Sequence, residues 1–63
     1  MPSAFSRERV NAIVEMFDEL LEELRAAKPN DRSEADRYTA ITITEVEKVR
    51  AVFIVYVKGE MHE

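Results

Sequence analysis

An uninterrupted apolar run near the C-terminus, Ala51 to Val57, constrains the fold of this chain more than any other feature. Valine, isoleucine and aromatic residues dominate the run, and these residue types are enriched in β-strands. A strand that is apolar on both faces is typical of a position buried on two sides. The run therefore predicts a strand that needs cover on both faces, and a chain of 63 residues has little other structure with which to provide it.

The segment before this run predicts the strand's partner. Residues 39 to 44, TAITIT, are rich in β-branched types and alternate along the chain. An antiparallel β-hairpin over residues 38–58 with a two-residue loop at Glu47-Lys48 places Glu45 opposite Arg50, a favourable cross-strand charge pair.

Two alternatives to this hairpin remain open. Tight hairpin loops favour glycine, which is absent from this position, so a longer loop over residues 45–50 is equally compatible with the sequence. A second helix starting at Thr44 is the other alternative, because Thr44 and Glu47 match a capping box. The density of β-branched residues disfavours that helix. Its apolar stripe would consist of Val46, Val49, Phe53, Tyr56 and Val57.

The N-terminal half of the chain predicts an amphipathic helix over residues 6–28. Ser6 or Ser3 is a suitable N-cap, and Pro29 ends the helix. Apolar residues recur at steps of three and four and share one face. They are Val10, Ile13, Val14, Phe17, Leu20, Leu21 and Leu24.

Together these elements predict a single small α+β domain, one N-terminal amphipathic helix packed on a C-terminal antiparallel β-hairpin. An arm over residues 1–5, a polar loop over 29–37 and a tail over 59–63 complete the chain. An isolated hairpin is marginal in water, and two-fold dimers are the commonest oligomers. We therefore expect dimerisation into a larger sheet, although cover by residues 29–37 or by a different protein would serve the same need. The expected self-association residues are Val52, Phe53, Ile54, Val55 and Tyr56.

Five carboxylates within nine residues form an acidic stripe on the side of the N-terminal helix opposite its apolar face. Such a stripe attracts a basic partner, although a solvated outer face that keeps the protein in solution explains it as well. Two like-charge pairs lie four residues apart in it, which slightly destabilises the helix. The stripe consists of Glu15, Asp18, Glu19, Glu22 and Glu23.

Composition argues against several classes of function. The chain has no cysteine and one histidine, His62, so we expect no disulfide, no metal site and no cofactor. Its net charge of -4 makes nucleic acid an improbable partner. The longest apolar run is too short to cross a bilayer, and no signal-peptide pattern is present, so a cytoplasmic protein without a membrane partner is expected.

Pro2 provides one resemblance. A chain near sixty residues that carries proline at its N-terminus after removal of Met1 resembles the 4-oxalocrotonate tautomerase family, in which that proline acts as a general base. The family runs strand, helix, strand, and its proline opens the first strand. Here Ser3, Ala4 and Phe5 leave no room for a strand before the helix. The resemblance rests on Pro2, the length and the helix-then-strand order.

The sequence therefore predicts a small acidic protein–protein interaction module, an adaptor or inhibitor that acts as a homo-oligomer. We expect it to be non-enzymatic, because no nucleophile–histidine–carboxylate set can be assembled from its ordered region. The alternatives are an acidic nucleic-acid mimic that occupies a basic protein surface, a structural subunit of a larger assembly, and, more remotely, a tautomerase-like enzyme that uses Pro2.

Overall fold

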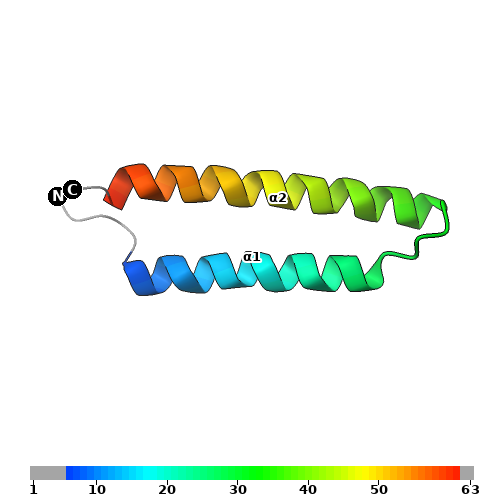
Figure 1. Cartoon of the computed structure of the whole chain (residues 1–63), viewed down its shortest axis with the longest axis horizontal. Coiled ribbons are helices and arrows are strands. Elements are labelled where there is room, and N and C mark those ends of the chain that lie inside the picture. The colour runs from blue at the N-terminus through cyan, green and yellow to red at the C-terminus, as the bar shows by residue number, and fades with distance from the viewer. Residues whose placement is uncertain (1–5, 62–63) are drawn as a thin grey trace.

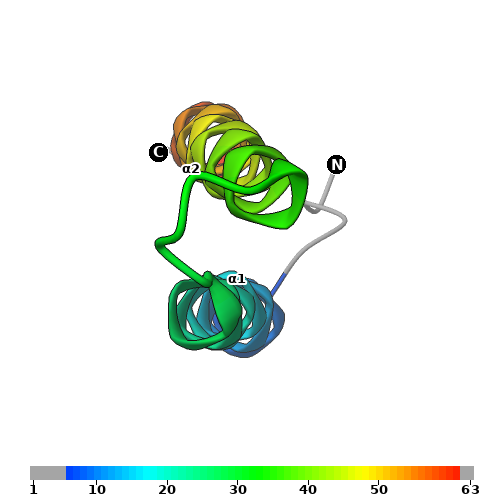
Figure 2. The ribbon, with the colours of Figure 1, turned by 90° about the vertical axis from the view of Figure 1, so that its right-hand side faces the viewer.

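The chain folds into a hairpin of two long helices. The computed structural model describes residues 6–61, and side chains over residues 6–59. Helix α1 spans Arg7–Ala27 and helix α2 spans Glu34–Met61. The helices lie side by side and antiparallel, joined at one end by a short connection (Figures 1 and 2). The molecule measures 50 × 16 × 12 Å, so it is a rod rather than a sphere.

Local signals set the ends of α1. The Ser6 side chain accepts a hydrogen bond from the backbone N–H of Arg9 at 3.1 Å, which satisfies one of the free donors of the first turn. At the other end, the N–H of Lys28 bonds the carbonyl oxygen of Leu24, and Pro29 then prevents the helix from continuing. The N-terminal helix predicted over residues 6–28 is therefore present.

The predicted β-hairpin over residues 38–58 is wrong. That segment lies entirely within α2, and the part of the chain that the structure describes contains no strand. The protein is all-helical rather than α+β, and a dimer built by extending a sheet is ruled out with it. The polar connection is also shorter than the predicted loop over residues 29–37, because α2 begins at Glu34, and α2 continues to Met61 into the predicted tail.

Capping at the start of α2 explains why the helix begins so early. The Ser33 hydroxyl accepts from the backbone N–H of Asp36 at 3.2 Å, and the Asp36 carboxylate accepts from the backbone N–H of Arg32 at 2.8 Å. Asn30 and Arg32 adopt positive φ angles of 59° and 63°, which turn the chain back. The caps and the turn together start α2 ten residues before Thr44, where the alternative helix was predicted to begin.

The β-branched residues of α2 are accommodated because the residues that face α1 follow a regular spacing, which the strand interpretation overlooked. Residues that face α1 recur at alternating steps of three and four, the pattern of helices that pack along a seam. Burial of this face outweighs helix-propensity costs of a few tenths of a kcal/mol per β-branched residue. The seam positions are Asp36, Thr39, Ile43, Val46, Arg50, Phe53 and Val57, all buried or half-buried.

Threonines of α2 also adapt to the helix. Each hydroxyl donates to the carbonyl oxygen four residues earlier, a common way for threonine to satisfy its side chain inside a helix. The three bonds are Thr39 to Ala35 at 2.6 Å, Thr42 to Tyr38 at 2.8 Å and Thr44 to Ala40 at 3.2 Å.

The core between the helices is thin. Among the described side chains, Leu21 and Val57 are the buried apolar residues, each 4% exposed. The rings of Phe17 and Phe53 meet across the seam, with their centroids 6.1 Å apart and their planes tilted by 50°. A single row of contacts from each helix therefore holds the hairpin together.

Candidate functional site

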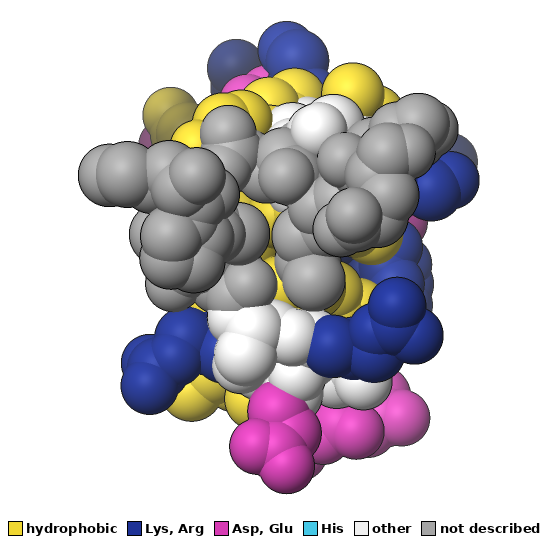
Figure 3. All heavy atoms as spheres, turned by 90° about the vertical axis from the view of Figure 1, so that its left-hand side faces the viewer, with side chains coloured by type: hydrophobic (Ala, Val, Ile, Leu, Met, Phe, Trp, Pro, Cys, Tyr) yellow, Lys and Arg dark blue, Asp and Glu magenta, His cyan; other side chains and the backbone are white. Residues whose placement is uncertain are grey.

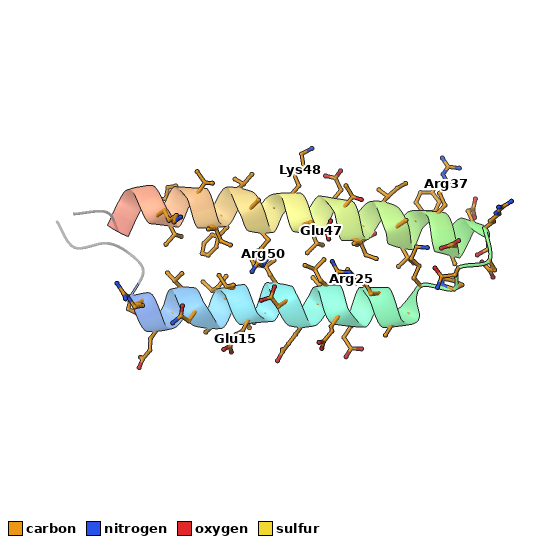
Figure 4. The ribbon with its side chains drawn as sticks, in the orientation of Figure 1. Glu15, Arg25, Arg37, Glu47, Lys48 and Arg50 are labelled. Carbon is orange, nitrogen blue, oxygen red and sulfur yellow. The ribbon has the colours of Figure 1, made fainter. Side chains whose placement is uncertain are left out.

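Ion pairs close one edge of the helix pair. The Asp18 carboxylate meets the Nε of Arg50 at 2.8 Å, and Glu47 meets Arg25 at 2.6 Å. Figure 4 shows Arg50 directed from α2 toward α1, and Arg25 and Glu47 directed toward each other. The Arg25–Glu47 pair is about half exposed and adds only about 0.5 kcal/mol, whereas Arg50 is half-buried and Asp18 is exposed. Arg50 was predicted to face Glu45 across two strands, and instead it joins the two helices.

A third ion pair, between Lys28 and Asp36, lies beside the turn. Its atoms are 2.6 Å apart, and the two side chains are 26% and 13% exposed. The hydrogen bond from Lys28 and the backbone N–H of Arg32 hold the pKa of Asp36 below its ordinary value, because both favour the charged form. The Asp36 carboxylate therefore ties the turn to the start of α2 while it is ionised.

The far side of α2, directed away from α1, is unexpectedly apolar. Its residues also follow alternating steps of three and four, and at 100° per residue they lie nearly opposite the seam. Val52 and Val55 are 63% and 70% exposed there. Lys48 points away from α1 (Figure 4). This surface, here called the outer stripe, consists of Tyr38, Ile41, Glu45, Lys48, Val52 and Val55, all exposed.

Further exposed apolar residues flank the outer stripe on one side. Val49 and Tyr56 of α2 are both more than half exposed, and Met16 of α1 is 66% exposed. Phe17 lines two shallow hollows, one with Ile41 and Val49 and the other with Met16 and Leu20. The side of the hairpin opposite the ion pairs is therefore apolar across both helices.

The acidic stripe of α1 lies on the outside of the hairpin. Its five residues are exposed, and Glu15 points away from α2 in Figure 4. Figure 3 shows Asp and Glu side chains gathered below α1, whereas hydrophobic side chains reach the surface above α2. Asp18 lies at the edge of the stripe and pairs with Arg50. No ion pair joins Glu15, Glu19, Glu22 or Glu23 to another residue of the described part.

The five predicted self-association residues do not share one surface. Val52, Val55 and Tyr56 are exposed. Phe53 packs against Phe17, and Ile54 is half-buried beside Val14 and Val57 in a hollow that Arg7 and Lys58 border. A helix separates these residues by about 100° each, whereas a strand would have sorted them onto two faces.

Sequence reasoning missed Tyr38, Ile41 and Lys48 as members of the exposed surface. The signal was present in the spacing, because residues 38, 41, 45, 48, 52 and 55 alternate steps of three and four. Glu45 and Lys48 place two charged residues in the middle of the stripe, so the apolar pattern is broken and the spacing was not recognised. On the seam, Arg50 likewise interrupts the apolar pattern between Val46 and Phe53.

The remaining predicted features carry no site in the structure. His62 and Pro2 lie outside the described residues. Within residues 6–61, no group of three or more acidic, histidine or cysteine residues is arranged to hold a metal ion. Neither of the two described helices is long and apolar enough to cross a membrane.

Comparison with known proteins gives no further guidance. No family model matches the chain, and neither the curated proteins nor the solved structures gave a significant match.

Proposed function

We propose that this protein is a small, non-enzymatic protein–protein interaction module that acts as a homo-oligomer. Helix α2 is the self-association element, and α1 presents the acidic stripe to the outside. The observation that carries the proposal is that α2 has apolar residues on two opposite sides, while α1 covers only one of them. A helix with apolar residues all round is typical of a position buried among several neighbours.

The size of the exposed surface supports this proposal. The hairpin exposes 5267 Å². A compact protein of 63 residues exposes about 4,200 Å², by the usual scaling with mass. The difference of about 1,000 Å² is similar to the surface that one partner contributes to a stable interface, about 800 Å². The chain therefore has enough excess surface for one side of an interface with a second polypeptide.

The lack of deeply buried side chains supports it as well. A marginal domain needs several kcal/mol from its core, and a fully buried leucine or valine contributes about 1.5–3 kcal/mol. Only two apolar side chains of the described part are buried in the hairpin. Association that covers Val52 and Val55 adds core that the single chain does not have.

The acidic stripe favours a basic protein as the external partner. Four of its carboxylates have no ion-pair partner within the described residues, and they repel one another along the helix. A lysine- or arginine-rich surface relieves that repulsion, and its binding weakens as salt rises. Imitation of nucleic-acid phosphates is one form that such a function takes.

Light scattering across a dilution series tests the self-association. We expect the wild-type chain to have the mass of a homo-oligomer and to dissociate on dilution. The Val52→Lys/Val55→Lys variant should shift dissociation to much higher protein concentration, because two ammonium groups would have to be buried in the interface. A Glu19→Lys/Glu22→Lys variant is the matched control on α1 and should keep the wild-type mass. A wild-type chain that remains a folded monomer at every concentration would contradict the proposal.

The same control variant tests the acidic stripe. Wild-type protein should bind a fluorescent oligolysine peptide with an affinity that falls steeply with salt, and Glu19→Lys/Glu22→Lys should lose that binding. Equal binding by both proteins would show that the acidic stripe is only a solvated surface.

A further inference from the structure

The two charges in the middle of the outer stripe limit how a second polypeptide can cover it. Glu45 and Lys48 are both exposed, and apolar residues lie on either side of them along α2. A partner helix must therefore be apolar at its two ends and charged in the middle, with a basic group against Glu45 and an acidic group against Lys48. The outer stripe itself meets this description when its direction is reversed.

We infer that the outer stripe is covered by the outer stripe of a second copy, which runs antiparallel to the first, with Glu45 of each copy against Lys48 of the other. The inference rests on the proposed homo-oligomer and specifies its interface. Side chains that are alternately three and four residues apart form successive layers between two paired helices. In an antiparallel pair, each layer contains a residue that begins a three-residue step in one copy and a residue that ends such a step in the other.

The residue numbers fit this arrangement over the whole outer stripe. When Glu45 lies against Lys48 of the second copy, Ile41 lies against Val52, and Tyr38 lies against Val55. Every apolar residue of the stripe then meets another apolar residue, and both charges meet their opposites. The two-fold axis passes between positions 46 and 47, so the same layers recur on its other side.

A parallel pair is disfavoured by the same charges. In that arrangement Glu45 would face Glu45 of the second copy, and Lys48 would face Lys48. Two adjacent layers of like charge would be brought together in the middle of an apolar interface, where repulsion is strongest. Charged or polar groups at otherwise apolar seam positions commonly fix the register and direction of paired helices, at some cost in stability.

Site-directed cross-linking tests the direction and the register. The natural chain has no cysteine, so each introduced thiol is unique. A mixture of the Ile41→Cys and Val52→Cys chains should form a covalent dimer on treatment with a short thiol-reactive cross-linker, because these positions share a layer. Either chain alone should cross-link at least about tenfold more slowly, because its own thiols are then separated by about 16 Å along the helix axis. Circular dichroism verifies that both variants remain helical.

Charge reversal tests the central layers by an independent measurement. Glu45→Lys alone or Lys48→Glu alone should raise the dimer dissociation constant about tenfold or more, because each change converts two attractive contacts into two repulsive ones. A mixture of the two variants should restore an affinity near that of the wild type, since the heterodimer regains both opposite-charge layers. Glu22→Lys on α1 is the matched control with the same charge change, and should have no effect.

The outcomes separate this inference from the proposed function. Self-cross-linking of each cysteine variant, or a dissociation constant unaffected by Glu45→Lys, overturns the antiparallel pairing while the homo-oligomer stands. An oligomer that forms without any cross-link through positions 41 and 52 also overturns it, because another surface is then used. A wild-type chain that is monomeric at all concentrations overturns both.

Discussion

Leu20 and Leu21 are adjacent leucines that differ almost completely in their surroundings. Leu21 is 4% exposed and Leu20 is 47% exposed. The helical rise and rotation alone produce this difference, because one step along α1 turns the side chain by about 100° out of the seam. The pair therefore allows the thin core to be probed with the same substitution at two neighbouring positions.

Leu21→Ala should lower the free energy of unfolding by about 3 kcal/mol, since it removes a buried side chain that the two helices cannot close around. Leu20→Ala should lower it by about 1 kcal/mol or less, because most of that side chain is already in water. Urea unfolding followed by circular dichroism measures both. Equal effects at the two positions would mean that the core does not follow the seam described above.

Asp36 makes the stability of the turn sensitive to acid. Its pKa is lowered in the folded chain by Lys28 and by the backbone N–H of Arg32. The stabilisation that the ionised Asp36 carboxylate gives the folded chain is therefore complete above the ordinary carboxyl pKa of 3.8. It is lost as the pH falls through the lower pKa of the folded chain. Asp31, whose pKa is lowered by hydrogen bonds from Ser33, acts in the same direction.

Asp36→Asn should flatten the fall in unfolding free energy below about pH 4, because asparagine cannot release a proton on folding. Lys28→Met should have a similar but smaller effect, since it removes the largest cause of the shift but leaves the backbone donor. Thermal unfolding across this pH range gives the measurement, and an acid limb unchanged in Asp36→Asn would show that other carboxylates control it.

At the scale of single elements, α1 was predictable and α2 was not. In α1 three features of the sequence indicate the same helix: the apolar stripe, the Ser6 cap and the Pro29 stop. In α2 the local preference of Val, Ile and Thr for strands conflicts with the three- and four-residue spacing that packs against α1. Tertiary burial decided the outcome, and it cannot be read from composition.

The candidate site was only partly predictable for the same reason. Val52, Val55 and Tyr56 were predicted as candidates because a single chain of this size has too little other structure to cover all its apolar side chains. That prediction does not depend on whether the segment is a strand or a helix. Phe53 and Ile54 were included with them because a strand was assumed. The roles of Glu45 and Arg50 were misassigned because their pairing was derived from strand register.

Thr44 offers a direct experimental distinction between a helix and a strand in this segment. Thr44 is exposed, and its hydroxyl bonds the carbonyl oxygen of Ala40. Thr44→Ala should raise the free energy of unfolding by about 0.5 kcal/mol, because alanine is the better helix former. In a strand the same change would be destabilising. Chemical unfolding gives the sign, and a loss of stability would contradict the helical structure.

At the scale of the whole molecule, folding and association are expected to be linked. If a second copy covers the outer stripe as proposed, a rod with so thin a core gains much of its stability from that contact, and its folded state is favoured by protein concentration. Thermal unfolding should shift downward by roughly 5 °C for each tenfold dilution, the size expected when a dimer of this length unfolds to separate chains. A midpoint independent of concentration would show that the hairpin is stable alone.

The unequal character of the two helices also sets a limit on growth. If two copies join through their outer stripes, the acidic stripe of each α1 lies on the outside of the pair. Because each outer stripe is used by the other copy, a two-fold pair is closed and does not extend into a filament. In a pair of this kind the acidic stripe of each copy lies in solvent, where its negative charge repels other pairs.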